Sequence, residues 1–144
     1  MPSIFFGSYE HQLDDKHRLR IPARFKKALV GEAGEKSYSF ARGKDNCIYV
    51  FPDSVLEEIL EKVASEKLGA ASTASLLFCS SISPAEEDSQ GRVVLPAMLR
   101  SLAGIKKDIV TVGRGNRLEI YSAEHYKKLT EALDYDALFS TLGI

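Results

Sequence analysis

The sequence has few cysteines and no long apolar run, and these absences exclude several classes of protein. Its 144 residues include two cysteines, Cys47 and Cys79, which form no Cys-x-x-Cys pair and have no histidine at zinc-ligand spacing. We therefore expect buried, reduced thiols rather than a disulfide framework or a structural zinc site. The N-terminus lacks a basic leader, and no apolar run is long enough to span a bilayer. We expect a cytoplasmic protein with no membrane partner.

Catalytic motifs are also missing. The sequence contains no His-Glu-x-x-His and no Gly-x-Ser-x-Gly, and its three histidines are scattered. Residues 34–37 resemble a phosphate-binding loop, but Glu35 stands where the motif needs glycine. Residues 113–115 begin like a dinucleotide fingerprint, but Leu118 occupies the position of its third glycine. We expect turns at both places, and we expect no enzyme, cofactor, metal or small-molecule substrate.

The charge is nearly balanced but unevenly distributed. Composition, 44% hydrophobic and 27% charged, is that of a globular protein, and the formal net charge of -1 gives no general affinity for nucleic acid. Between residues 16 and 27, however, the sequence KHRLRIPARFKK holds six lysines and arginines and no acid. One strongly basic segment therefore lies within a neutral protein.

An internal repeat organises the chain. Residues 14–23, DDKHRLRIPA, match residues 88–97, DSQGRVVLPA, and the shared pattern is DxxxR(L/V)x(I/L)PA. Each copy is followed by a short amphipathic segment and then by two strand-like runs around a turn. Each half therefore has the predicted order strand, turn, strand, short helix, hairpin, longer helix.

The hairpins and longer helices have local signals. The predicted strand pairs are 38–41 with 47–51 and 109–112 with 118–121, with Gly and Asn in the turns where positive φ is needed. A helix should begin at Asp53 or Ser54, with Glu57 in a capping box, and another at Ser122. The apolar faces of these two helices are Val55, Leu56, Ile59, Leu60 and Val63, and Tyr126, Leu129 and Leu133. We divide the chain into a first repeat (5–68), a connecting linker or weak helix (69–80), a second repeat (81–133) and a tail (134–144).

The paired DxxxR motifs, each followed by apolar-x-apolar-Pro, resemble the double swapped-hairpin AbrB-type domain. The opening Phe5-Phe6-Gly7, which leads to Leu13-Asp14, is similar in particular to the start of the MraZ family of transcriptional regulators. The resemblance implies a mainly β fold with flanking helices (α+β), built as a pseudo-twofold barrel from two repeats of one chain. The family pattern usually has glycine before the arginine; Gly91 fits it, whereas His17 departs from it.

The aspartates of the two motifs can accept backbone N–H groups and pair with the arginine four residues on, so we assign Asp14, Asp88 and Gly91 to turn structure. The resemblance implies DNA contact through the first loop and its strand, and local charge supports that choice. The candidate DNA-binding residues are Lys16, His17, Arg18, Arg20, Arg24 and Arg92. The second loop has Arg92 as its only cation and follows Glu86-Glu87, so we assign it mainly to the fold and to subunit contacts. Two alternatives stay open: local ion pairs of Arg18 and Arg92 with their aspartates, and an ordinary solvated basic face.

By resemblance, the protein is a regulator of its own division and cell-wall gene cluster. It would bind direct repeats in promoter DNA as a ring-shaped homo-oligomer such as an octamer, associated with the nucleoid, and repeated patches would raise affinity through effective concentration. Two other functions stay open: an antitoxin-like partner-binding module and a purely structural ring-forming protein. Residues 134–144 leave little room for a partner-binding tail.

Overall fold

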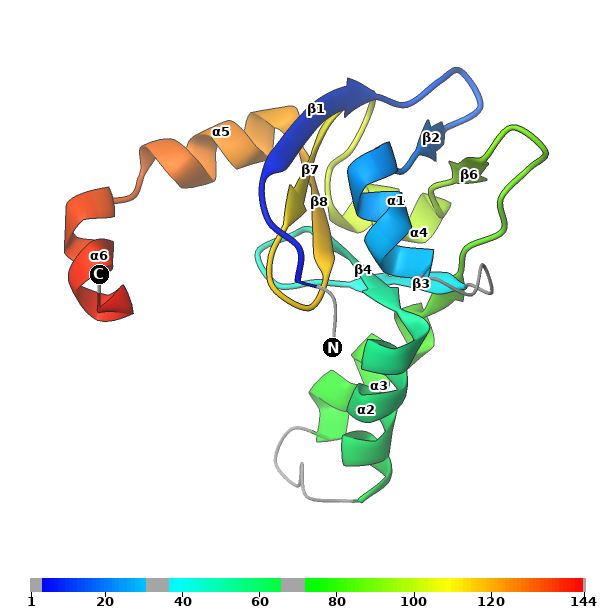
Figure 1. Ribbon diagram of the computed structural model, residues 1–144, viewed down its shortest axis with the longest axis horizontal. Coiled ribbons are helices and arrows are strands. Elements are labelled where there is room, and N and C mark those ends of the chain that lie inside the picture. Colours follow the sequence, from blue (N-terminus) through cyan, green and yellow to red (C-terminus); the bar gives the residue numbers. More distant parts are fainter. Residues whose placement is uncertain (1–3, 31–36, 66–71, 144) are drawn as a thin grey trace.

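The computed structural model describes residues 4–30, 37–65 and 72–143, and within them the chain forms a mixed α+β fold (Figure 1). The first half contains β1 (Ser8–Gln12), β2 (Arg18–Arg20), α1 (Ala23–Val30), β3 (Tyr38–Arg42), β4 (Ile48–Pro52), α2 (Asp53–Ala64) and α3 (Ser72–Ser81). The second half contains β5 (Ser83–Pro84), β6 (Arg92–Val94), α4 (Ala97–Leu102), β7 (Asp108–Gly113), β8 (Leu118–Ser122), α5 (Ala123–Glu131) and α6 (Tyr135–Leu142).

The predicted order of elements is confirmed in both halves. The hairpins β3–β4 and β7–β8 lie within one residue of their expected limits. Asn46 and Gly115 have φ of 55° and 77° in the two turns, as hairpin geometry requires. Residues 34–36, part of the sequence that resembles a phosphate-binding loop, lie outside the described residues.

The strands of the two halves interleave. In the six-stranded antiparallel sheet, β1 pairs with β7 and β5 pairs with β3, so each outer strand belongs to the opposite half from its partner. At the centre, β4 pairs with β8 and places Tyr49 opposite Glu119, which occupy equivalent positions in the two hairpins. Strands β2 and β6 form a separate two-stranded ladder. The outer strands β1 and β5 do not pair with each other, so the described strands form no closed barrel.

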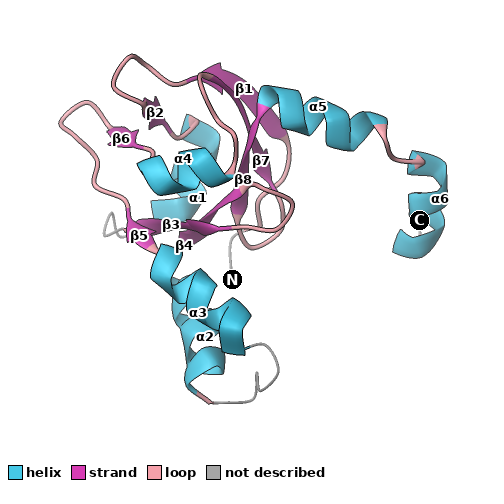
Figure 2. Cartoon of the chain, turned by 180° about the vertical axis from the view of Figure 1, so that it is seen from behind, coloured by secondary structure: helices cyan, strands magenta, loops and turns pink. Residues whose placement is uncertain are grey.

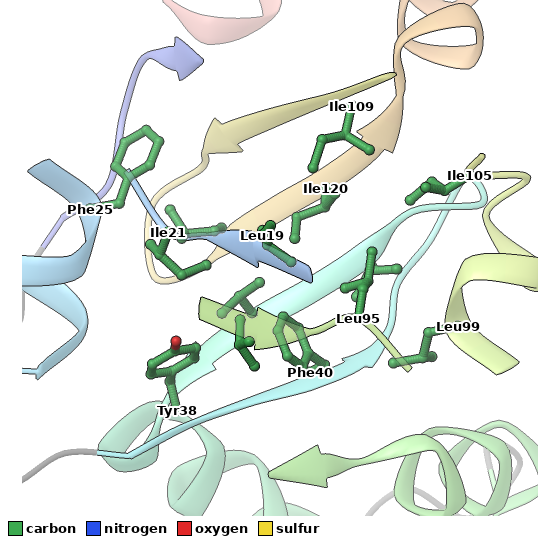
Figure 3. Packing of buried hydrophobic residues seen from close by; sticks show 14 of the residues in the cluster. Leu19, Ile21, Phe25, Tyr38, Phe40, Leu95, Leu99, Ile105, Ile109 and Ile120 are labelled. Carbon is green, nitrogen blue, oxygen red and sulfur yellow. The ribbon is translucent and has the colours of Figure 1, made fainter. Parts of the chain in front are cut away.

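Both halves contribute to one core between the ladder and the sheet (Figure 3). Leu19 of β2 and Val93 of β6 are buried on the inner side of the ladder, and Phe25 and Leu99 enter the core from helices α1 and α4. Other buried members include Ile21, Tyr38, Phe40, Leu95, Ile105, Ile109 and Ile120. Because the core mixes residues from the two copies, neither half has a complete core of its own.

Three helix predictions need correction. Helix α2 begins at Asp53, but its N-cap is Pro52 without a side-chain hydrogen bond, and the Asp53 carboxylate instead accepts the Ser37 hydroxyl at 2.8 Å. The expected capping box is therefore wrong. Leu60, placed on the buried face, is 37% exposed. The cap at Ser122 is confirmed, because its hydroxyl accepts the His125 N–H at 3.0 Å, but α5 ends before Leu133.

Helices lie in the connecting segment, where a linker or weak helix was expected, and in the segment that was predicted to be a tail. From residue 72 the connecting segment is helix α3, which packs beside α2 below the sheet, while residues 69–71 lie outside the described part. The tail contains α6, which follows α5 away from the body, and we call residues 131–143 the arm (Figures 1 and 2). No helix in the described residues is long and apolar enough to cross a membrane. Both cysteines are free; Cys47 is buried as expected, but Cys79 is partly exposed.

Candidate nucleic-acid interface

The two DxxxR turns are built by the same hydrogen bonds. In the first, Asp14 Oδ1 accepts the backbone N–H groups of Lys16 and Arg18, each at 2.9 Å, and Oδ2 accepts Arg18 Nε–H at 2.7 Å. In the second, Asp88 accepts the corresponding groups of Gln90 and Arg92 at 2.9, 2.9 and 2.8 Å. One carboxylate thus closes each loop and orients the arginine that follows it.

The third residue after each aspartate adopts a left-handed conformation. Its φ is 60° at His17 and 76° at Gly91, and its N–H donates to the aspartate carbonyl at 2.9 and 3.0 Å. The departure from glycine is therefore accommodated with the turn intact, because histidine enters this region more readily than most residues.

The local ion pairs weighed as an alternative are present in both copies. Each arginine Nε lies against its own aspartate, and Arg18 Nη1 also lies 3.8 Å from Asp88 Oδ2 across the ladder. Backbone hydrogen bonds, led by those from Arg18 and Arg92, hold the pKa of the Asp14 and Asp88 carboxyls below the usual value. The aspartates are therefore ionised at neutral pH, and they leave terminal guanidinium nitrogens of both arginines for other contacts.

The ladder between β2 and β6 brings the two motifs together. Its register pairs Arg18 with Val94, Leu19 with Val93 and Arg20 with Arg92. Because Leu19 and Val93 face the core, their neighbours Arg18, Arg20, Arg92 and Val94 face outward. We call these four residues the ladder face. Arg20 is exposed and has no hydrogen bond or ion pair with any described residue, so it lies opposite Arg92, which pairs with Asp88, without a carboxylate of its own.

The other candidate residues divide into two groups. Lys16 and His17 are exposed at the tip of the first loop, which extends beside the second loop (Figure 1). The Arg24 guanidinium instead donates to the Phe6 carbonyl at 3.3 Å and lies 4.9 Å from the Phe25 ring centroid. The structure therefore brings five of the six candidates together around the ladder and places Arg24 against the N-terminal segment.

An open hollow of about 870 Å³ adjoins the ladder and adds residues that sequence reasoning missed. Its lining includes Arg18, Arg20 and Arg92, and also Gln90 and Lys107. Lys26, part of the basic segment, forms an ion pair with Glu87 of the second half. Lys107 could not be placed from the sequence, because long-range pairing of β1 with β7 brings it beside the first loop, where the Leu13 N–H donates to its carbonyl at 2.9 Å.

Comparison with known proteins gives consistent matches over most of the chain. The family model described as "MraZ protein, putative antitoxin-like" matches residues 4–79 and 84–141. A protein of Natranaerobius thermophilus named transcriptional regulator MraZ is 40% identical over 126 residues, covering 85% of this chain and 84% of the relative. Relatives of the same name from Symbiobacterium thermophilum and Clostridium tetani are 40% and 36% identical, covering 87% and 98% of this chain and 88% and 100% of the relatives. The chain belongs to the MraZ family.

Proposed function

We propose that this protein is a sequence-specific DNA-binding transcriptional regulator that acts through the ladder face and the tip of the first loop. Its target would be direct repeats in the promoter of its own division and cell-wall gene cluster, where it acts as a repressor on the nucleoid. The names of its relatives support a role in transcription. The same interface could not be recognised from net charge, because the chain as a whole carries -1.

One observation carries the proposal: Arg20 and Arg92 are directly opposite in the ladder. Like charges at paired positions destabilise an antiparallel ladder. Asp88 neutralises Arg92 in part, whereas Arg20 has no carboxylate partner among the described residues. A phosphate or the acceptor edge of a guanine could accept hydrogen bonds from both guanidinium groups. Repulsion between Arg20 and Arg92 in the free protein is therefore expected of a surface that binds DNA.

The turns prepare the arginines for such contacts. Because each aspartate binds the Nε side of its arginine, the guanidinium orientation is set before DNA arrives and less side-chain entropy is lost on binding. Arginine bonds O6 and N7 of guanine in the major groove, whereas lysine acts as a point charge on phosphate. We assign base contacts to Arg18, Arg20 and Arg92 and phosphate contacts to Lys16 and His17.

We further propose that the two repeats form a pseudo-twofold swapped-hairpin unit, with repeats at 5–68 and 81–133. The exchange of outer strands between the halves supports this arrangement. So do the two central pairs, Leu19 with Val93 and Tyr49 with Glu119, because each joins equivalent positions of the repeat.

Exposed apolar side chains support self-association into a ring. The arm exposes Leu133, Tyr135, Leu138 and Leu142 at 56%, 66%, 39% and 69%. The α2–α3 pair exposes Leu60, Leu76 and Leu77, and the apolar hollow of about 450 Å³ beside it is flanked by Lys44 and Arg117. The arm carries Glu131, Asp134 and Asp136 and no cation. We propose that the arm of one subunit contacts the α2–α3 pair of the next, a head-to-tail contact that can close into a ring.

Fluorescence anisotropy with DNA from upstream of the gene and with scrambled DNA, at several salt concentrations, tests the function. We expect tighter binding to the upstream DNA and an affinity that falls as salt rises. The change Arg20→Ala should weaken upstream binding roughly 5- to 150-fold, the range for loss of a base contact. Lys127→Ala, which removes an exposed cation on α5 outside the ladder face and the proposed subunit contact, is the matched control. Equal weak binding to both DNAs would instead favour the partner-binding or structural module.

Light scattering after size exclusion tests assembly. Leu142→Asp should lower the mass of the oligomer, and Ser140→Asp on the same exposed helix should leave it unchanged. An unchanged mass in the Leu142 variant would exclude the arm as the contact.

A further inference from the structure

Val94 is the member of the ladder face that the proposed function leaves unused. It is 53% exposed, although the residue beside it, Val93, is 2% exposed in the core. In the repeat, Val94 corresponds to Arg20 of the first copy. The ladder face is thus three arginines and one branched apolar side chain, where an exact duplication would have given four arginines.

The register fixes the neighbours of Val94. The Leu95 N–H donates to the His17 carbonyl at 3.0 Å, so the backbone bond between the strands lies at this position, whereas the Arg18 N–H donates to Asp14 and turns away from β6. Because the two kinds of pair alternate along an antiparallel ladder, Arg18 and Val94 form a non-hydrogen-bonded pair, with Cβ atoms about 5 Å apart. Val94 therefore lies beside Arg18 on the outer side of the ladder.

A surface that meets base edges in the major groove needs a complementary group at every position. Valine donates and accepts no hydrogen bond, and the one apolar group that the four bases display in the major groove is the C5 methyl of thymine. We propose that Val94 is a specificity-determining residue that packs against a thymine methyl beside the base contacted by Arg18. This inference rests on the proposed function and adds to it that Val94 selects thymine at one position of the DNA site.

The substitution also gives the interface a direction. If positions 20 and 94 both held arginine, the ladder face would present the same groups to the two ends of its DNA site. With Arg20 at one end and Val94 at the other, the two ends select different bases, so a single subunit prefers a site that is not a palindrome. A ring of such subunits oriented the same way fits consecutive sites that point in one direction.

Replacement of thymine by deoxyuridine tests the inference, because it deletes the methyl and leaves the hydrogen-bonding edge intact. Each thymine of the upstream duplex is replaced in turn, and anisotropy titrations compare the unaltered protein with Val94→Ala. Val112→Ala, a partly exposed valine on β7, is the matched control. We expect one replacement to weaken binding of the unaltered protein and of the control about fourfold, the effect of one buried methyl-sized group. The Val94 variant should bind that duplex and the thymine duplex equally.

Other outcomes separate the two proposals. If the unaltered protein prefers upstream DNA but the same replacement affects it and the Val94 variant alike, the role of Val94 is refuted while the function stands. If the Val94 variant changes the mass of the oligomer and keeps the sensitivity to the methyl, Val94 belongs to a contact between subunits. If the unaltered protein shows no preference for upstream DNA, the function fails and the inference fails with it.

Discussion

The left-handed position of the first DxxxR turn yields a quantitative prediction. His17 has φ of 60°, and its side chain contacts no described residue through a hydrogen bond or ion pair. An L-residue in this conformation costs roughly 1–2 kcal/mol, whereas glycine enters it freely. Glycine also makes the unfolded chain more flexible, which offsets about 0.4–1 kcal/mol. His17→Gly should therefore raise the free energy of unfolding by about 0.5–1 kcal/mol and the Tm by roughly 1–4 °C.

The opposite substitution, from glycine to a residue with a Cβ, can be made in the second DxxxR turn. A Cβ added at Gly91 would meet nothing within 4 Å, so Gly91→Ala introduces backbone strain at φ of 76° without a steric clash. It should lower the free energy of unfolding by about 1 kcal/mol. Equilibrium urea unfolding at one protein concentration, with thermal unfolding in parallel, measures both variants. If His17→Gly leaves stability unchanged or lowers it while Gly91→Ala lowers it, strain at His17 is not the relevant energy, and the histidine side chain stabilises the turn.

Three further predictions concern charge and burial. The pKa of Asp88 is lower in the folded protein than in the unfolded chain, so its stabilisation is present above about pH 4 and is lost as pH falls through the folded pKa. Asp88→Asn should therefore reduce the fall of the urea midpoint that occurs as the pH is lowered below about 4. Arg117→Ala should lower the free energy of unfolding by about 1–3 kcal/mol in urea titration, because the fully buried Glu119 carboxylate loses its 2.8 Å ion pair with Arg117. It keeps Arg114 at 3.0 Å and the Tyr121 hydroxyl at 2.6 Å, and an effect below about 0.5 kcal/mol would mean that these two partners are sufficient. Burial raises the pKa of the Cys47 thiol to about 12, so iodoacetamide at pH 8 should label Cys79 well before Cys47 by mass spectrometry, and equal labelling would show that the hairpin opens.

Local patterns were enough to predict the hairpins and the turns. Each depends on residues close in the chain: glycine or asparagine where φ is positive, and an aspartate within reach of the N–H groups that follow it. The four-residue spacing from Asp14 to Arg18 is therefore sufficient to predict the hydrogen bonds between them. Because these hydrogen bonds join residues close in the chain, the two copies of the repeat could be aligned from the sequences of their turns alone.

The composition of the ladder face could not be predicted, because it depends on the register between segments more than 70 residues apart in the chain. No local pattern states that Arg20 lies opposite Arg92 or that Val94 faces outward beside Arg18. Arg24 shows the opposite case: it belongs to the basic segment, but packing against Phe6 and Phe25 removes it from the face. Helix α6 was missed because an apolar run in a short C-terminal segment was treated as a tail.

The exchange of outer strands has a consequence for synthesis of the protein. Gln12 at the end of β1 pairs with Asp108 at the start of β7, 96 residues further along the chain. At a translation rate of about 5–20 residues per second, β1 leaves the ribosome on the order of 5–20 s before its partner has been made. During that interval the apolar residues of the first half have no second half to cover them. A nascent chain released before β7 would therefore yield an aggregation-prone fragment, because the sheet of the first half is completed only when the second half has been made.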